Sequence, residues 1–226
     1  MKPEFEWMIV ELARAIRDGE FTGVGTLSPL PLAALLLARR THAPSGRHFA
    51  FFKHDVALSG GTKEFFDFAQ RGDLDLFFLS GAQVAANGDI NLSVIGANHD
   101  RPRVRLPGGA GSAMLYECAR RVVLFSMRHD VRTLVKGVDF VTARGTSARQ
   151  LDRLVTPLAT FVFEEGRFVL DAIRSDVTIE EVRAQTGFPV ASPRRAPPEI
   201  DDNTRALIAG PVRAEVAAVY PAFSAT

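Results

Sequence analysis

The sequence predicts a three-layer α/β fold, in which helices cover both faces of an open, mainly parallel sheet. Short apolar runs alternate with helical patterns through the first two-thirds of the chain, which is typical of the units that build a parallel sheet. The run at residues 74–79 is apolar except for one aspartate, as in a strand buried on both faces. Turn signals at Asn87-Gly88 and at residues 164–167 separate later apolar segments, so we expect antiparallel hairpins at the edges.

The length, composition and net charge of the chain limit the kinds of protein that it can be. The chain has 226 residues, 46% hydrophobic and 23% charged, which fits one large globular domain. A net charge of +1 gives no strong attraction for nucleic acid or an anionic membrane, so neither is an expected partner. The longest apolar stretch, residues 30–38, is too short to span a bilayer. Cys118 is the single cysteine, which excludes an internal disulfide framework and favours the reducing cytoplasm.

The expected elements of the first third follow from apolar spacing and from helix start signals. Ser28 is a candidate N-cap, because Pro29 after it suits the first position of a helix. Gly19 ends the first helical pattern. In chain order we expect helices at residues 4–18, 30–40 and 62–71 and strands at residues 21–25 and 48–52.

The rest of the chain is expected to be richer in strands. Further strands are predicted at residues 74–79, 82–86, 90–95, 122–125, 138–142, 158–163 and 168–173. Thr178 with Glu181 forms a capping box for a helix over residues 179–185. A proline-bearing segment then suggests a boundary, which divides the chain into a domain at residues 1–192 and a C-terminal arm at residues 193–226. The arm is expected to hold a short helix that starts at Asp201 and a loose tail.

The most informative segment is the glycine-rich stretch that holds Gly108, Gly109, Ala110 and Gly111. Small residues let another group approach the backbone closely. A helix predicted over residues 113–119 would direct free N–H groups and its positive dipole end toward this stretch. A phosphate, a carboxylate or a developing oxyanion is therefore expected here, and the alternative is an ordinary surface loop.

Five segments, in this order, carry a resemblance to a known family. They are the turn and helix from Gly25 to Pro44, the strand and hairpin from Phe77 to Gly96, the glycine-rich stretch, residues 122–130 and residues 138–142. Together they resemble the β subunit of family I coenzyme A transferases of the glutaconate CoA-transferase type, over residues 20–190.

The resemblance implies an open α/β sheet and an α subunit that supplies much of the CoA site, in a heterodimer or heterotetramer. It implies chemistry on an acyl-CoA thioester at the subunit interface, with coenzyme A as part of the substrate and with no bound cofactor or metal. In such transferases a glutamate of the β subunit attacks the thioester carbonyl, and backbone N–H groups hold the oxyanion.

This chain departs from the family at that nucleophile. The glutamate is expected near residues 51–55, yet no glutamate lies between Glu20 and Glu64. The resemblance therefore points to divergent members, which cleave a ring-bearing acyl-CoA in steroid breakdown or decarboxylate a glutaconyl-type CoA. The second group uses a cysteine near the lost glutamate, and this chain has none there.

Lys53 and His54 lie where the nucleophile is missing and are the candidate catalytic residues. His54 could act as a general acid or base near neutral pH, and Lys53 could neutralise a substrate carboxylate. The alternative is that both are surface residues of a loop after a strand.

Ser28, Asn91 and Ser93 complete the predicted substrate contacts. Ser28 is an N-cap that can also present a helix N-terminus to a carboxylate. Asn91 and Ser93 share one face of a strand that lines the active site in the family, and the alternative is a polar face against solvent or a partner. Arg101, Arg103 and Arg105 alternate as well; they could receive CoA phosphates or form a solvated or subunit-facing stripe.

Three functions remain open from the sequence. The first is a subunit of a hydrolase or a decarboxylating lyase that acts on a carboxylated acyl-CoA without a covalent glutamyl step. The second is a genuine CoA-transferase, and the third is a non-catalytic scaffold subunit.

Overall fold

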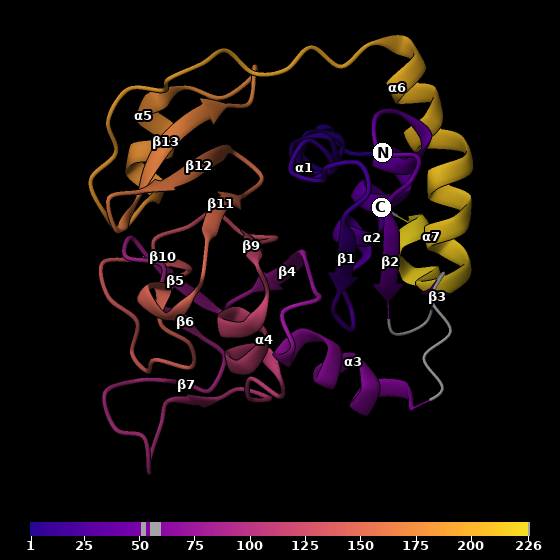
Figure 1. Ribbon diagram of the computed structural model, residues 1–226. Helices are drawn as coiled ribbons and strands as arrows, with labels where there is room; N and C mark the ends of the chain where they lie inside the picture. Colours follow the sequence, from indigo (N-terminus) through magenta and orange to yellow (C-terminus); the bar gives the residue numbers. More distant parts are fainter. Residues whose placement is uncertain (51–52, 55–59, 226) are drawn as a thin grey trace.

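The computed structural model describes residues 1–50, 53–54 and 60–225. Its centre is an eight-stranded sheet with the order β13-β12-β11-β9-β4-β1-β2-β3 among these residues (Figure 1). The strands are β1 (Phe21–Val24), β2 (Arg47–Ala50), β3 (Lys53–His54), β4 (Leu76–Ser80), β9 (Arg121–Phe125), β11 (Leu151–Val155), β12 (Ala159–Glu164) and β13 (Arg167–Ile173).

The middle of the sheet is parallel and both edges are antiparallel, as predicted. β2, β1, β4, β9 and β11 pair in parallel, and Val24 lies between Ala50 and Phe78 in the register. β3 turns back along β2, while β12 and β13 form a hairpin beside β11.

Helices cover both faces of this sheet. Along β4, Leu76 and Phe78 pack with α1 (Pro3–Ala13) and α2 (Pro29–Arg40), whereas Phe77 and Leu79 pack in a second core. That second core includes residues from α3 (Gly61–Gln70), α4 (Ser112–Cys118) and α5 (Ile179–Gln185). Because successive side chains of a strand point to opposite faces, the continuous apolar pattern of β4 produces the three layers.

The direction of winding changes beside β1. The chain runs from β1 through α2 to β2 on one side, and later returns through α3 to β4 on the other side of β1. α2 and α3 cover opposite faces of the sheet. Such a switch leaves a crevice at the carboxyl ends of the two neighbouring strands, and ligands of open α/β sheets bind there.

Smaller strand pairs lie at that end of the molecule. β5 (Gln83–Ala85) pairs with β6 (Ile90–Asn91) and with β10 (Leu134–Val135), while β7 (Val94–Ile95) and β8 (Val104–Arg105) form an arm (Figure 1). The predicted Asn87-Gly88 hairpin is confirmed, with Gly88 at φ +81°.

The strand predicted at residues 138–142 was wrong, and β11 was missed. Residues 138–142 form no strand in the described structure. The carboxylate of Asp139 accepts from the amide of Gly96, its amide donates to the side chain of Gln83 on β5, and Ala143 makes an isolated bridge to Ile90. Conversely, β11 was not predicted, because Asp152 and Arg153 interrupt its apolar pattern. Arg121 on β9 accommodates this interruption by binding Asp152 at 2.6 Å.

The end of the chain is also not a loose tail. Asp201 caps α6 (Asp202–Leu207), which continues through a π-helical turn at Ile208–Val212 into α7 (Arg213–Val219). Ile208, Val212 and Val216 are fully buried against the α1–α2 layer, and Figure 1 shows these helices (yellow) beside α2. Their spacing of four residues places them on one helical face.

No helix among the described residues has the length and apolarity that a membrane crossing requires.

Candidate active site

A cavity of about 340 Å³ opens at the carboxyl ends of β1 and β4, at the point where the winding changes. Its walls are the turn after β1, the end of β4, the loop at residues 107–112 and the apolar side chains Phe66, Leu92 and Leu115. The structure therefore brings Ser28 together with Gly108, Gly109, Ala110 and Gly111, all of them substrate contacts predicted from the sequence.

The glycines of this loop are needed mainly for close packing within the chain. A Cβ on Gly109 would lie 2.6 Å from Cγ2 of Thr142, and one on Gly111 would lie 2.5 Å from the ring of Phe66. Gly108 has φ +91° and open space around its Cα, so it alone of the three has the conformation that favours glycine. The N–H of Gly108 donates to the carbonyl of Leu92 at 3.0 Å and fixes the loop.

Backbone donors in the cavity wall are left available. The structure records no acceptor among the described residues for the N–H groups of Ala110 and Gly111. Ala110 has φ +43°, a left-handed conformation that costs a residue with a Cβ about 1–2 kcal/mol. α4 has seven residues, so its dipole contributes less than that of a longer helix would. The free amides, rather than the helix, are the groups that suit an oxyanion.

The turn between β1 and α2 forms the opposite wall. Ser28 occupies the N-cap position as predicted, but its hydroxyl donates to the carbonyl of Thr26 at 3.3 Å and caps no amide. Leu27 has φ +56° and is 79% exposed, an unfavourable conformation and an unfavourable place for a leucine.

Asn91 and Ser93 form a polar network beneath the loop. Asn91 is fully buried; its amide nitrogen donates to Gln83 and Val94, and its oxygen accepts from the amides of Ser93 and Val94. The Ser93 hydroxyl lies 2.8 Å from that of Thr142, the residue that packs on Gly109. Leu92 between them lines the cavity, and direct substrate contact by either polar residue stays a prediction.

Lys53 and His54 form β3, and they pair with Ala50 and Phe49, the last two residues of β2. Their side chains lie outside what the structure describes, as do residues 51–52 and 55–59, where the family nucleophile is expected. A catalytic role for Lys53 and His54 therefore stays a prediction. Arg101, Arg103 and Arg105 are exposed on or beside the β7–β8 arm, and both interpretations of them remain open.

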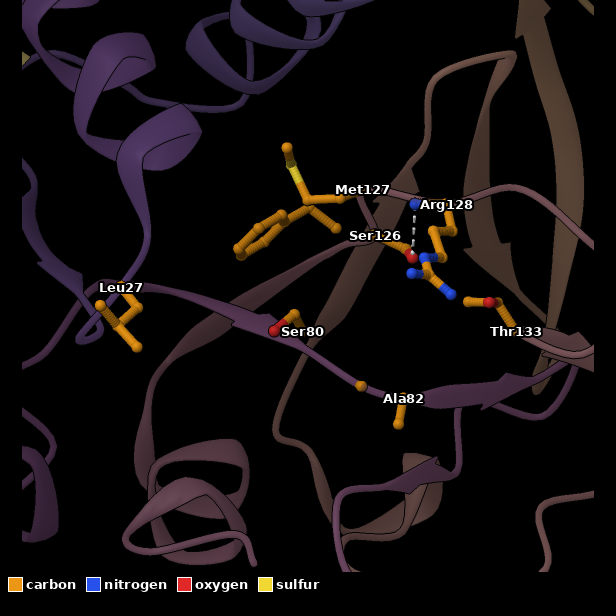
Figure 2. A pocket seen from close by; sticks show the side chains of 9 residues that line it. Leu27, Ser80, Ala82, Ser126, Met127, Arg128 and Thr133 are labelled. Atoms are coloured by element: carbon orange, nitrogen blue, oxygen red, sulfur yellow. Dashed lines mark hydrogen bonds between the residues drawn. The ribbon is translucent and has the colours of Figure 1, made fainter. Parts of the chain in front are cut away.

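A second cavity, of about 350 Å³, shares the lining residue Ser80 with the first. Figure 2 shows the side chains that line it. It lies where β4 and β9 end, and Arg128 is its charged wall residue among those described. This cavity was not predicted from the sequence. The signal was present, since Ser80 is the last residue of one buried apolar strand and Ser126 directly follows another.

His129 and Asp130 follow Arg128 but do not form a catalytic pair. His129 is buried, with its ring nitrogens 2.8 Å from the Thr156 hydroxyl and 2.9 Å from the Thr186 hydroxyl. Burial lowers the pKa of His129 to about 4, which keeps the ring neutral near pH 7. Asp130 instead accepts hydrogen bonds from the amides of Arg132 and Thr133 in its own turn.

Comparison with known proteins identifies the family of this chain and finds solved structures with a similar fold. The family model for coenzyme A transferases matches residues 48–185. The B-type subunit of the 3-oxoadipate CoA-transferase of Pseudomonas knackmussii is 31% identical over 223 residues, which cover 82% of this chain and 83% of that protein.

Two solved structures are similar along nearly the whole chain. A chain of the decarboxylase AibA/AibB has a TM-score of 0.81 and 30% identity, and the match covers 93% of this chain and 97% of that one. Glutaconate coenzyme A-transferase from Acidaminococcus fermentans has a TM-score of 0.77 and 21% identity, covering 92% and 93% of the two chains, and shares the fold.

Proposed function

From the premise that this chain belongs to the coenzyme A transferase family, we propose that it is the β subunit of a heteromeric enzyme that processes a carboxylated acyl-CoA without a covalent glutamyl-CoA step. The reaction classes in question are hydrolysis of a carbon–carbon bond and decarboxylation. Coenzyme A enters as part of the substrate, and no other cofactor is needed.

The observation that carries this proposal is the glycine-rich loop at the switch point of the sheet. Ala110 and Gly111 offer two neighbouring backbone N–H groups in the wall of the cavity. A thioester carbonyl placed there gains hydrogen bonds that strengthen as its oxygen becomes negative. One such donor typically contributes about 10²- to 10³-fold to the rate of an acyl-transfer reaction.

The missing glutamate is compatible with chemistry of this kind. In the decarboxylation of a glutaconyl-type CoA, the bond to the distal carboxyl carbon breaks and carbon dioxide leaves. The electron pair spreads through the conjugated chain onto the thioester oxygen, and a proton then returns to carbon. The loop stabilises the negative oxygen, and no residue has to attack the carbonyl. His54 is the proposed proton donor. Lys53 is one candidate partner of the substrate carboxylate, and Arg128 at the second cavity is the other.

Relatives named as the B-type chains of CoA-transferases imply an A-type partner, in a heterodimer or heterotetramer. The proposed partner completes the CoA site and brings further acid–base groups. Leu27 and Met127, which line the second cavity and are 79% and 45% exposed, are apolar groups that such a partner would cover. We place the complex in the cytoplasm, where a chain with one cysteine stays reduced.

A genuine CoA-transferase is the second candidate, because the relative with 31% identity is named as one. It requires a carboxylate of this chain, at another position, that forms an anhydride and then a thioester with CoA.

One experiment separates these candidates. The chain is produced with its A-type partner, incubated with an acyl-CoA and treated with hydroxylamine or borohydride, and its peptides are analysed by mass spectrometry. The proposal predicts no modified carboxylate in this chain together with turnover of a carboxylated acyl-CoA. A labelled Asp or Glu would establish the transferase instead, and the absence of any thermal shift with CoA esters would favour a scaffold.

A further inference from the structure

We propose that the second cavity is a carboxylate subsite, in which Arg128 recognises the distal carboxylate of the acyl group. This inference rests on the proposed function and names the substrate class, namely CoA thioesters of short dicarboxylic acids. It depends on the position of the cavity, its charge and its unsatisfied hydrogen-bond donors.

The position follows from Ser80, the last residue of β4, which lines both cavities. A thioester oxygen held at the glycine-rich loop leaves the acyl chain free to pass Ser80 into the second cavity. Leu27, Phe125 and Met127 supply an apolar wall there for the methylene groups of such a chain. A group at the far end of the acyl chain then meets Arg128 (Figure 2).

The charge of the cavity favours an anion. Arg128 is the ionisable group among the described lining residues, and no hydrogen bond or ion pair of its guanidinium is recorded within the described chain. The nearest acid in sequence, Asp130, is already used by the amides of Arg132 and Thr133. An unpaired guanidinium suits a carboxylate, which it can bind with two parallel hydrogen bonds.

Two hydroxyl groups add donors that the protein does not use. The Ser126 side chain is buried, and its oxygen accepts from the amide of Arg128 at 3.2 Å, while no acceptor for its proton is recorded among the described residues. Ser80 likewise has no recorded side-chain partner there. In Figure 2 the Arg128 side chain lies beside Ser126 and Thr133, so a carboxylate between them would receive both charge and hydroxyl donors.

The test is an equilibrium binding measurement on the complex with its A-type partner. The probes are glutaryl-CoA and pentanoyl-CoA, which have acyl chains of equal length and differ in the terminal carboxylate. The variants are R128Q and S126A, with R132Q as the matched control. The Arg132 side chain is 82% exposed and lies outside the cavity wall. Because binding is measured, the result does not depend on which bond the enzyme breaks.

We expect the wild-type complex to bind glutaryl-CoA more tightly than pentanoyl-CoA. R128Q should lower the affinity for glutaryl-CoA by about 10- to 100-fold, and S126A should lower it by about 3- to 10-fold. The affinity of both variants for pentanoyl-CoA should stay within about twofold of the wild-type value, which would also show that they are folded. R132Q should change neither ester.

Equal weakening of both esters by R128Q, or no change in either, would overturn the subsite and leave the proposed function standing. Failure of the wild-type complex to bind either ester would overturn both.

Discussion

The polar groups at the two ends of the parallel sheet differ in whether the protein itself satisfies them. At the amino ends, Arg121 at the start of β9 is buried and binds both oxygens of Glu20 before β1 and an oxygen of Asp152 on β11, at 2.6–2.8 Å. At the carboxyl ends, the guanidinium of Arg128 and the amides of Ala110 and Gly111 have no recorded partner among the described residues. The first end satisfies its charges within the chain and serves stability, whereas the second keeps donors available for a ligand.

The largest effect is expected from a substitution of Arg121, which removes its ion pairs with Glu20 and Asp152 at the amino ends of the strands. Arg121→Met leaves Glu20 without its cation and Asp152 with Arg153 alone, which should lower the free energy of unfolding by about 3 kcal/mol. Denaturant titration of the complex measures this. Arg120→Met is the control: its side chain is 60% exposed, and losing its pair with Asp75 and its hydrogen bond to the Gly72 carbonyl should together cost at most about 2 kcal/mol. Equal losses for the two variants would contradict the contrast between the ends.

A variant of His129 tests whether this buried polar residue, which follows Arg128 in the sequence, contributes to stability. Its pKa is about 4 in the folded protein because of burial and about 6.5 when unfolded, so the unfolded state binds more protons between these values. The contribution of His129 to the free energy of unfolding is therefore fully present above about pH 6.5. It is lost as the pH drops through about 4, by about 3 kcal/mol in total. The difference in pH dependence between the wild type and His129→Gln measures this, and identical slopes would contradict it.

A larger residue in the glycine-rich loop should lower the stability of the protein through a packing clash. Gly109→Ala places a Cβ against the methyl group of Thr142, which should cost about 1–3 kcal/mol. Thr142→Ser removes that methyl group and keeps the hydroxyl that Leu92 and Ser93 use, so the double variant should recover most of the loss.

A double-mutant cycle measures the coupling between these two positions. Gly137→Ala is the control, since its added Cβ meets no atom within 4 Å. Strictly additive effects of Gly109→Ala and Thr142→Ser would show that the loop needs its glycine for another reason.

The smallest effect concerns Ser28. Its hydroxyl caps no helical amide, so Ser28→Ala should change the free energy of unfolding by less than about 0.5 kcal/mol. Thr178→Ala removes a capping box that the structure does contain and should cost about 1 kcal/mol. Thermal denaturation of both variants checks the order, and a larger loss for Ser28→Ala would mean that its hydroxyl supports the cavity wall in another way.

The sequence predicted those parts of the fold that local pattern determines. β4 was predicted because a strand buried on both faces must be apolar throughout, and the Thr178 capping box because its two hydrogen bonds join residues three apart. β11 was missed because Asp152 is buried there against Arg121, a residue 31 positions away that the fold alone brings near, as well as against its neighbour Arg153.

The candidate site shows the same limit. The glycine-rich loop and Ser28, each singled out by a local signal of small residues or of a helix start, line one cavity, and their contact with a substrate stays a prediction. The purpose assigned to Gly109 and Gly111 was incomplete, because Thr142 and Phe66, which pack on them, are distant in sequence. The second cavity was missed because its walls come from the ends of two strands, where Ser80 and Arg128 meet only in the folded sheet.

The most direct measurement of the central claim is a crystal structure of the complex with its A-type partner and glutaryl-CoA. The account predicts the thioester oxygen at about 2.7–3.1 Å from the amide nitrogen of Ala110 or Gly111, with coenzyme A attached to no carboxylate of this chain. A thioester carbonyl outside the first cavity, or an Asp or Glu of this chain bonded to coenzyme A, would contradict it.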